Sequence, residues 1–574
     1  MQKFFPFLQW LSNYTSANLS KDLVAGLTVG IILIPQGMAY AMIAGLPPVY
    51  GLYASIFPLL IYVLLGTSRQ LAIGPVAMDS LLVAAGLSAL AISGVENYIM
   101  MAIFLAFMVG AIQLLLGICR MGFLVNFLSK PVISGFTSAA ALIIIFSQLK
   151  HLLGVNITNS NKFHQLVRNA FEKISETNSF DFALGIVGIV IIVGLKQWSK
   201  KIPGILLVVI LGILAVYFLD LEAKGVTIVG TIPIGLPEFR VPNINIENIL
   251  NIWPIALTLA LVGFLEAISI GKALQEKSGL ETIDSNQELV ALGASNMIGS
   301  FFQSYPTTAS FSRSAINGEA GAKTNLSALF SVILVVMTLL FLTPLFYYLP
   351  NAILASIIMV SVFGLIDLSY AKNLWRNRKD EFIVLIVTFL ATLLIGIPPG
   401  ILIGVLFSLL LMVYRTSNPH FAVLGNIKGS DYYKNVNRFA DEVVLRNDLL
   451  IVRFDAQLYF GNAAFFKREL FKHIDAKSAD LRGVILNAEA INYIDSSAAQ
   501  MLTKVIQEIH ARALQFYIAG AIGPTRDIIY SSGIIHELHT EFLFVKIKEA
   551  VAYFDDPSSV SVLQGKVAHQ NRTK

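Results

Sequence analysis

The chain has 574 residues, of which 56% are hydrophobic and only 13% are charged, and its formal net charge at pH 7 is +5. A water-soluble protein usually carries about 25% charged residues, so this composition excludes an ordinary soluble enzyme. The basic residues stand singly between apolar runs rather than in a stripe, which argues against a nucleic-acid partner. A single cysteine, Cys119, excludes an intrachain disulfide and a cysteine-based metal cluster.

Apolar runs long enough for bilayer-spanning helices recur through the first 420 residues, so we expect a lipid bilayer around this part of the chain. The expected spans are 22–45, 50–66, 97–118, 122–149, 181–197, 202–219, 251–275, 324–347, 350–369, 380–396 and 398–415. Three more apolar segments, 70–93, 287–301 and 305–318, are interrupted by Gly, Pro, Ser, Thr or charged residues. Counting them as spanning or half-spanning elements gives fourteen.

An even number of spans places both termini on the same side of the membrane. With a cytoplasmic N-terminus, most loop lysines and arginines, such as Lys196, Lys272, Lys323 and Arg415, fall on the cytoplasmic side, as the positive-inside rule requires. The sequence therefore predicts a multi-pass protein of the cell membrane with both termini in the cytoplasm.

The fourteen elements also divide into two sets of seven. Residues 72–77 in the third element and 304–310 in the tenth are both short extended stretches, broken at Pro75 and Pro306 and followed by a short helical pattern. Seven elements per repeat invert the second copy, so the N-termini of these half-helices would meet near the midplane. Paired helix N-termini present free N–H groups and positive partial charge, which favours an anion site.

The composition changes after residue 420, because 35 of the remaining 154 residues are charged, compared with 42 of the first 420. Short apolar strands and helical periods then alternate, which predicts a soluble α/β domain. We expect a transmembrane domain at 1–420, a linker at 421–442, the α/β domain at 443–556 and a polar tail at 557–574.

Ionisable residues inside the spans are candidates for function because their burial is costly. Glu266 could take up and release protons in the bundle, although a structural carboxylate bonded to a neighbouring helix end is the alternative. Asp79, four residues after Pro75, fits a structural cap, or a supporting role beside the anion site, better than direct anion binding, because its charge would repel the anion.

Polar residues near the half-helices suggest how an anion could be held. Ser312 and Arg313 open the second half-helix, and a guanidinium offers a planar, permanently charged fork for an oxyanion. In the alternative, Arg313 reaches the cytoplasmic edge or pairs with Glu319. Gln36 and Tyr40 lie one turn apart on the first span and share a face that could line the site or join two helices.

No sequence typical of a hydrolase or a phosphoryl-transfer enzyme is present, so we expect no enzyme, no catalytic residue, no metal and no cofactor. The segments 35–40, 45–53, 66–70 and 73–75 instead resemble the SulP family of anion permeases, often called sulfate permeases. The segments 312–314, 317–318 and 321–324 are similar to the second-repeat motif of that family. Residues 490–497 resemble a STAS domain, the usual companion of such permeases.

The resemblance implies a polytopic α-helical membrane protein with 7+7 inverted repeats, core and gate domains, a cytoplasmic α/β STAS domain and a homodimer. It places the anion site between the third and tenth helices. The residues it assigns are Gln36, Tyr40, Val76, Ala77, Ser312 and Arg313. A carboxylate at the position of Glu266 resembles that of cation-coupled members, with glutamate suggesting protons. Related anti-sigma antagonists are phosphorylated at the position of Ser496, which we interpret here as an ordinary helix N-cap.

We therefore predict secondary active transport of a small anion by an elevator-like mechanism, with sulfate:proton symport first. Bicarbonate or a dicarboxylate is the alternative substrate, and an uncoupled exchanger or channel of the same fold is the alternative mechanism. A nucleobase permease shares the fold, but the Ser312–Arg313 pair and the STAS domain argue against it. A membrane-anchored STAS signalling scaffold is the rival from another class, and it would have no use for paired half-helices.

Overall fold

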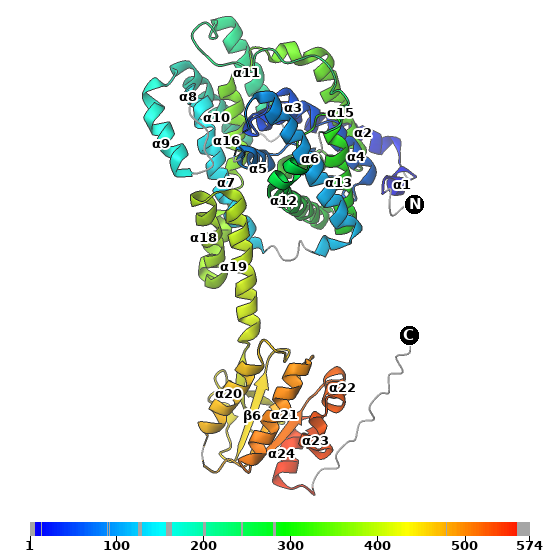
Figure 1. Ribbon diagram of the computed structural model, residues 1–574, viewed down its shortest axis with the longest axis vertical. Coiled ribbons are helices and arrows are strands. Elements are labelled where there is room, and N and C mark those ends of the chain that lie inside the picture. The colour runs from blue at the N-terminus through cyan, green and yellow to red at the C-terminus, as the bar shows by residue number, and fades with distance from the viewer. Residues whose placement is uncertain are drawn as a thin grey trace. The chain divides into compact units, whose positions relative to one another are not determined.

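The computed structural model describes residues 6–12, 14–88, 90, 92–123, 129–156, 163–198, 203–242, 245–278, 283–477 and 479–558. The chain divides into two compact units, Met1–Ser408 and Leu409–Lys574 (Figure 1). The first unit is helical, and the second alternates strands and helices.

The first unit starts with the short helix α1 (Phe7–Leu11), after which seven apolar elements follow. They are α2 (Ser16–Ile43), α3 with α4 (Val49–Tyr53 and Phe57–Leu65), β1 with α5 (Ile73–Gly74 and Ala77–Ser88), α6 (Val95–Ile118), α7 (Lys130–Ser147), α10 (Ser179–Trp198) and α11 (Gly204–Leu219). Between α7 and α10 lie α8 (Leu149–Leu153), α9 (Phe163–Lys173) and the short turn η2 (Ile174–Glu176).

Seven further elements repeat this order of long, short and broken pieces. They are α12 (Ile246–Ser278), α13 (Ser285–Ser300), β2 with α14 (Thr308–Ala309 and Phe311–Glu319), α15 (Leu326–Met337), α16 (Asn351–Phe363), α18 (Lys379–Leu394) and α19 (Ile397–Ser417). The turns η3 (Thr338–Leu342) and η4 (Thr343–Phe346) extend α15, and α17 (Leu368–Asn377) follows α16. A proline lies inside the first helix of each set, Pro35 in α2 and Pro254 in α12.

Among the described residues, eight helices are long and apolar enough to cross a membrane. Shorter apolar helices occur at Val49–Leu65, Ala77–Ser88 and Gly204–Leu219. The remaining three of the fourteen expected elements are α13, α14 and α18, so each segment that the sequence marked as apolar forms an element of the unit.

The helix contacts follow the 7+7 inverted repeat. By their order in the two sets, α4 corresponds to α13 and α6 corresponds to α15. The contact of α6 with α13 therefore corresponds to the contact of α15 with α4, and both contacts are present. In the same way, the packing of α2 against α15 corresponds to that of α12 against α6. The packing of α7 against α18 corresponds to that of α16 against α10. Two groups result: α2 to α6 pack with α12 to α15, and α7, α10 and α11 pack with α16 and α18. We call them the core group and the gate group.

Glycines let the backbones of the core group approach closely. A methyl group added at Gly110 of α6 would lie 2.4 Å from the backbone nitrogen of Met297 in α13, and one at Gly293 would lie 2.4 Å from that of Leu114. On the other side of the group, a methyl group at Gly26 of α2 would lie 2.1 Å from the carbonyl oxygen of Ser327. Small residues at such crossings let helices pack by van der Waals contact within a bilayer.

The second unit contains a seven-stranded sheet in the order β4-β3-β6-β7-β8-β9, with β5 also paired to β3. Its strands are β3 (Phe421–Ile427), β4 (Tyr433–Asn435), β5 (Val443–Val444), β6 (Leu449–Phe454), β7 (Gly483–Asn487), β8 (Gln515–Ala519) and β9 (Leu543–Phe544). Strands β6 to β9 run parallel, and β3 pairs antiparallel with β6, with Phe421 opposite Phe454.

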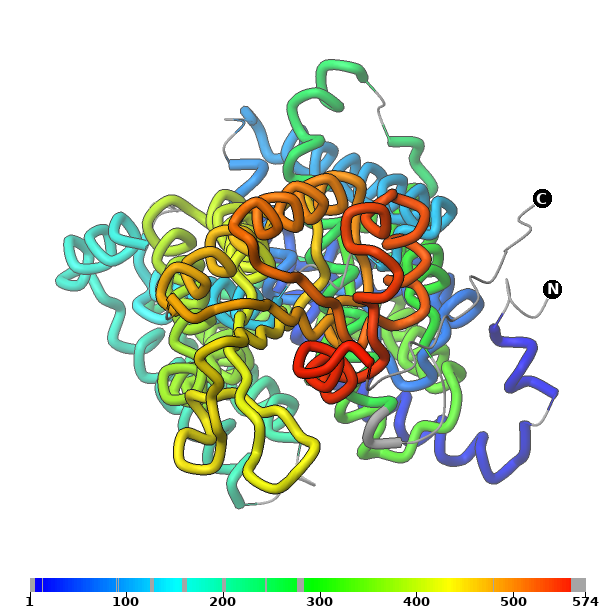
Figure 2. The backbone as a smooth tube through the Cα atoms, turned by 90° about the horizontal axis from the view of Figure 1, so that it is seen from below, coloured from blue at the N-terminus to red at the C-terminus, as the bar shows by residue number. Residues whose placement is uncertain are grey.

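Helices cover both faces of this sheet, which Figure 2 shows from below. They are α20 (Ala463–Asp475), α21 (Ser496–Ala511), α22 (Gly523–Ser531), α23 (Ile534–Leu538) and α24 (Ile547–Asp555), with the turn η5 (Thr540–Phe542) before β9. One apolar core joins the sheet to α20 through α23, with Phe466 and Leu502 fully buried. A second core on the opposite face includes Ala550 and Phe554 of α24.

The expectation of a linker at 421–442 was wrong, because this segment supplies β3 and β4. The alternating apolar residues of 421–427 pair with β6 and bury Ala422 and Leu424 in the second core. Most of the polar tail expected at 557–574 lies outside the described residues.

Candidate functional site

The two half-helices meet where β1 and β2 pair antiparallel, with Ile73 opposite Ala309 and Gly74 opposite Thr308. Each strand leads directly into a helix, β1 into α5 and β2 into α14. Because the strands are antiparallel, the helices leave the pairing in opposite directions and their N-termini lie at the same place. The first N–H groups of a helix have no acceptor within it, so this junction carries free donors and positive partial charge.

Arg313 of α14 crosses this junction. Its side chain is fully buried, and its Nη2 donates a hydrogen bond to the carbonyl oxygen of Pro75, 2.8 Å away in the first repeat. Its Nη1 lies 3.5 Å from Oε1 of Gln36, whereas its Nε has no partner among the described residues. Arg313 therefore neither reaches the cytoplasmic edge nor pairs with Glu319, and the Nε–H of its guanidinium is free.

Gly74 makes room for this guanidinium. Its φ of +149° is rare for residues with a side chain, and a methyl group at this position would lie 3.2 Å from Nη2 of Arg313. The glycine in the segment 73–75 therefore serves both the backbone conformation and the close approach of a charged side chain.

The other residues assigned by the resemblance surround the same junction. Gln36 and Tyr40 of α2 are both buried, and α2 also packs against α16 of the gate group. Val76 and Ala77 are buried where β1 passes into α5. Ser312 is exposed in the first turn of α14, with its Oγ 3.4 Å from that of the N-cap residue Ser310. The structure thus brings all six residues to the meeting point of α2, α5 and α14.

Glu266 lies on α12, which packs against α5, β2 and α14. One turn before it, Gly263 accepts a hydrogen bond at its carbonyl oxygen from Thr308 Oγ1, 2.7 Å away, which fixes β2 against α12. Among the described residues, neither carboxylate oxygen of Asp79 accepts a hydrogen bond, and its Oδ1 is buried without a partner. The expectation of a structural cap was therefore wrong, and a supporting role of Asp79 beside the anion site stays a prediction.

Sequence reasoning missed the residues that hold β2 in place. Asn296 of α13 accepts a hydrogen bond from the backbone N–H of Thr307, 2.8 Å away, and donates one to its carbonyl oxygen. The hydroxyl of Tyr305 lies 3.1 Å from that of Ser80 in α5. In the sequence, Tyr305 was marked by its position next to Pro306, and Asn296 was marked as a polar residue inside an apolar run.

Sequence reasoning also missed two buried carboxylates that join distant segments. Glu288 of α13 accepts hydrogen bonds from the Tyr62 hydroxyl, from the backbone N–H and hydroxyl of Thr67, and from the N–H of Ser68. Asp22 of α2 accepts four in the same pattern, from Tyr14, Lys323 and twice from Thr324. The segments 66–70 and 321–324 of the sequence motifs therefore serve as anchors for these carboxylates.

In the second unit, the expectation for Ser496 was off by one residue. Asp495 is the N-cap of α21 and accepts a hydrogen bond from the N–H of Ala498, 2.8 Å away, whereas Ser496 is the first helical residue and is exposed. A carboxylate accepts the same bond with a full charge, so it suits the positive end of the helix well.

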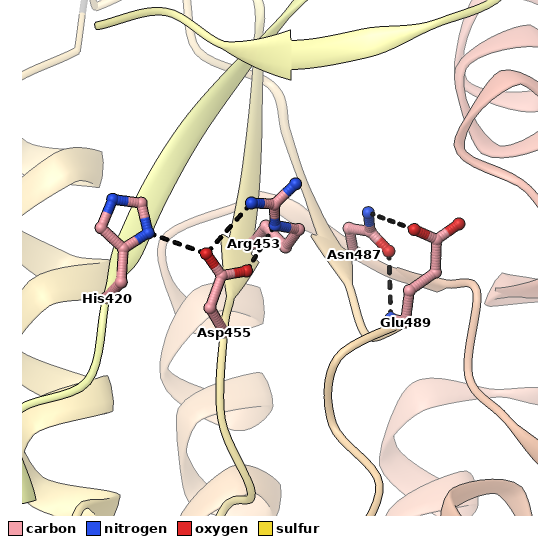
Figure 3. A network of polar contacts seen from close by, with 5 residues as sticks. All are labelled: His420, Arg453, Asp455, Asn487 and Glu489. Atoms are coloured by element: carbon pink, nitrogen blue, oxygen red, sulfur yellow. Dashed lines mark hydrogen bonds and ion pairs between the residues drawn. The ribbon is translucent and has the colours of Figure 1, made fainter. Parts of the chain in front are cut away.

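A polar network occupies the edge of the sheet where the parallel strands end (Figure 3). His420 Nδ1 lies 2.7 Å from Oδ2 of Asp455, and Arg453 donates hydrogen bonds to both oxygens of that carboxylate. Burial acts to raise the pKa of Asp455, but the hydrogen bonds from Arg453 and His420 outweigh it and lower the pKa. On the neighbouring strand, Asn487 contacts Glu489 through its side-chain amide.

Comparison with known families matches both units. Residues 19–388 match the model of the sulfate permease family, and residues 442–551 match the STAS domain. The chain belongs to the sulfate permease family. As a member of this family it is a multi-pass membrane protein with the 7+7 fold and a C-terminal STAS domain.

Relatives of this permease are similar along nearly its whole length. It is 39% identical over 569 residues to sulfate transporter 4.1, chloroplastic, of Arabidopsis thaliana, covering 95% of this chain and 82% of that protein. It is 33% identical over 536 residues to the probable sulfate transporter MT1781 of Mycobacterium tuberculosis, covering 93% and 95% of the two chains.

Solved structures show the same fold. The murine anion transporter Slc26a9 in the inward-facing state superposes with a TM-score of 0.88 at 27% identity, covering 96% of this permease and 94% of that chain. The transmembrane domain of the cyanobacterial bicarbonate transporter BicA gives a TM-score of 0.61 at 21% identity and covers 69% and 98%. At that identity, the second likeness concerns the fold alone.

Proposed function

We propose that this permease is a secondary active transporter of a small anion, with sulfate as its substrate and protons as its coupling ion. The observation that carries the proposal is the fully buried Arg313, whose guanidinium lies between the N-termini of α5 and α14 and retains a free Nε. A permanent cation and two helix N-termini at one point favour an anion. The names of the relatives, which match along nearly the whole chain, support sulfate over bicarbonate or a dicarboxylate.

Glu266 is the residue that we propose for proton coupling. It lies on the helix that packs against both half-helices, and its carboxylate has no hydrogen-bond or ion-pair partner among the residues that the structure describes. A carboxylate that is not tied to a neighbour can gain and lose a proton without breaking structural bonds. The alternative of a structural carboxylate bonded to a helix end has no support from these contacts.

An elevator-like movement of the core group is consistent with how the site is built. The proposed site residues lie on α2, α5, α12 and α14 of the core group, except Val76, which directly precedes α5, and α2 also packs against α16 of the gate group. The site can therefore move as one body past α7 and α16 while the distances within it stay constant.

Uptake of radiolabelled sulfate into liposomes containing the purified protein tests this proposal. We expect accumulation against the sulfate gradient when an inward proton gradient is imposed, and none without it. Bicarbonate and fumarate are added as competitors, and the variant Glu266→Gln should lose the dependence on the proton gradient. Glu247→Gln, an exposed carboxylate on the same helix, is the control and should behave as the wild type.

The outcomes separate the alternatives. Sulfate flux that equilibrates without accumulating, unaffected by the proton gradient, would indicate an uncoupled exchanger or channel. Absence of sulfate uptake with strong binding of bicarbonate or fumarate would replace the substrate.

We also propose a cell-membrane location, cytoplasmic termini and a homodimer. The only cysteine of the sequence, Cys119, is exposed at the end of α6, the fourth membrane element, which a cytoplasmic N-terminus places on the cytoplasmic side. A membrane-impermeant thiol reagent should therefore label it in inside-out vesicles and not in intact cells. Light scattering of the purified protein in detergent measures the number of subunits.

A further inference from the structure

Asp79 is a buried carboxylate for which the anion site alone gives no role. Its side chain, in the first turn of α5, is only 2% exposed, and its Oδ1 has no hydrogen-bond partner. An ionised carboxylate that is removed from water without a partner is strongly disfavoured. Binding of a proton removes this charge and so lowers the cost of burying the group.

The position of Asp79 connects it with Glu266. A methyl group added at Gly263 of α12 would lie 3.4 Å from Oδ2 of Asp79, so this carboxylate lies against α12 at the level of Gly263. Glu266 follows three residues later and therefore lies on the same face of the helix, one turn away. The two carboxylates therefore occupy neighbouring levels of the contact between α5 and α12.

The other ionisable groups around the pair are few. Arg313 of α14, Tyr305 before β2 and Tyr40 of α2 form the surrounding set, and Tyr305 interacts electrostatically with both Asp79 and Arg313. Among the side chains that the structure describes, the remaining ionisable ones on α12 and on the helices packed against α5 and α12 lie toward helix ends: Lys21 and Asp22 on α2, Glu96 and Tyr98 on α6, Lys130 on α7, Glu247 and Lys272 on α12, Glu288 on α13 and Glu319 on α14. Asp22 and Glu288 are already bound by four hydrogen bonds each.

We infer that Asp79 and Glu266 form a carboxylate pair that shares the coupling proton, an inference that rests on the proposed function and adds a second residue to it. Two carboxylates this close cannot both ionise without repelling each other, so they titrate as a unit. With both ionised, two negative charges oppose the single positive charge of Arg313 and repel an incoming anion. One shared proton leaves one charge of each sign, and anion binding becomes favourable. Proton binding and anion binding thus assist each other, as symport requires.

The variant Asp79→Asn tests the pair in the liposome assay. Without the negative charge of Asp79, Glu266 binds its proton only in more acidic solution. The pH of half-maximal sulfate uptake should therefore move by about one unit or more, and uptake at neutral pH should depend less on the proton gradient, because Glu266 alone balances the charge of Arg313. Asp79→Glu, which restores a carboxylate, should return the midpoint toward the wild-type value, and Glu247→Gln is again the control. A merely structural role for Asp79 would lower the amount of active protein without moving the midpoint.

The number of protons taken up per sulfate bound gives a second readout, measured by titration calorimetry of the full chain in buffers of different ionisation enthalpy. It should fall in Asp79→Asn at neutral pH and vanish in Glu266→Gln. If Asp79→Asn does not fold, difference infrared spectra of the wild-type protein at two pH values replace it, and a protonated carboxyl band that is sensitive to sulfate is expected.

Each contrary result has its own meaning. An unchanged pH midpoint and an unchanged proton count in folded Asp79→Asn would overturn the pair while leaving Glu266 as a lone coupling residue. Accumulation of sulfate driven by a sodium gradient rather than by a proton gradient would contradict the proposal that the two carboxylates share a coupling proton. Failure of the wild type to accumulate sulfate in a proton gradient would instead overturn the proposed function itself.

Discussion

The guanidinium of Arg313 is bonded to the backbone of Pro75, so a side chain of the second repeat closes the half-helix junction of the first. The two residues are 238 positions apart in the sequence. This bond fixes the guanidinium at the one point where both helix N-termini are within reach. The cation is therefore positioned before any anion arrives, which reduces the ordering cost of binding.

Replacing Arg313 with Gln should weaken sulfate binding at least tenfold, because a charge-assisted contact and the local positive charge are both lost, at a cost of about 1.5–3 kcal/mol. Arg313→Lys should recover only part of the affinity, since an ammonium cannot bond Pro75 and an anion with one planar fork. Titration calorimetry of the purified variants measures both. Arg240→Gln, an exposed arginine outside the site, should bind as the wild type does, and equal affinities for all four proteins would contradict a binding role.

Glu288→Gln should destabilise the membrane unit by about 2–4 kcal/mol, because a buried carboxylate with four donors is replaced by an amide whose NH2 group faces donors. Asp22→Asn should act similarly. Thermal unfolding followed by size-exclusion chromatography reports the change. Glu319→Gln, at an exposed position, serves as the control. If Glu288→Gln and Asp22→Asn were as stable as this control, the two carboxylates would not hold the segments together.

Gly110→Ala should lower thermal stability because the added methyl group would lie 2.4 Å from the backbone of α13, which cannot yield as a flexible side chain can. Gly194→Ala in α10 is the matched substitution, since nothing lies within 4 Å of its added methyl group. That change should be neutral or slightly stabilising through helix propensity. A similar loss in both variants would mean that the crossing of α6 and α13 is not limiting.

The network of His420, Arg453 and Asp455 should make the STAS unit less stable in acid. The folded state lowers the pKa of Asp455 below its ordinary value of about 3.9. Its stabilising effect is therefore complete above that value and is lost as the pH falls through the lowered pKa. Hydrogen exchange of β3 and β6 in the full chain, compared at neutral and acidic pH, measures this loss.

Asp455→Asn should already show faster exchange near neutral pH and a smaller further change in acid. Asp441→Asn, at an exposed position, should keep the wild-type dependence. Identical pH profiles for all three proteins would show that the network does not contribute to the stability of the sheet.

Much of the membrane fold could be predicted from the sequence because apolar length and proline position are local signals. The half-helices followed from Pro75 and Pro306, and both lie where the sequence placed them. The partners of Glu288 and Asp22 could not be predicted, because more than 200 residues separate each carboxylate from the donors that bind it across the helix bundle. The sequence indicates the burial of such a carboxylate only by a single charged residue near an apolar run.

In the soluble part, sequence reasoning missed β3 for a different reason. Residues 421–427 have a strand-like alternation, but the Asn, Gly, Asp and Tyr residues that follow are typical of a connection, and they outweighed the short apolar pattern. Pairing with β6 decides the matter, and β6 lies beyond that polar stretch. The N-cap of α21 was misplaced by one residue because Asp495 and Ser496 are both good caps, and only backbone geometry distinguishes them.

The inverted repeat has the symmetry of a duplicated ancestor, yet the two halves are no longer interchangeable. Asp79 and Gln36 belong to the first half, whereas Glu266 and Arg313 belong to the second. A pairing of two copies of the first half would reproduce the crossed strands without a cation, and two copies of the second would have two cations facing each other. The site therefore requires two unlike halves, because each half supplies groups that the other lacks.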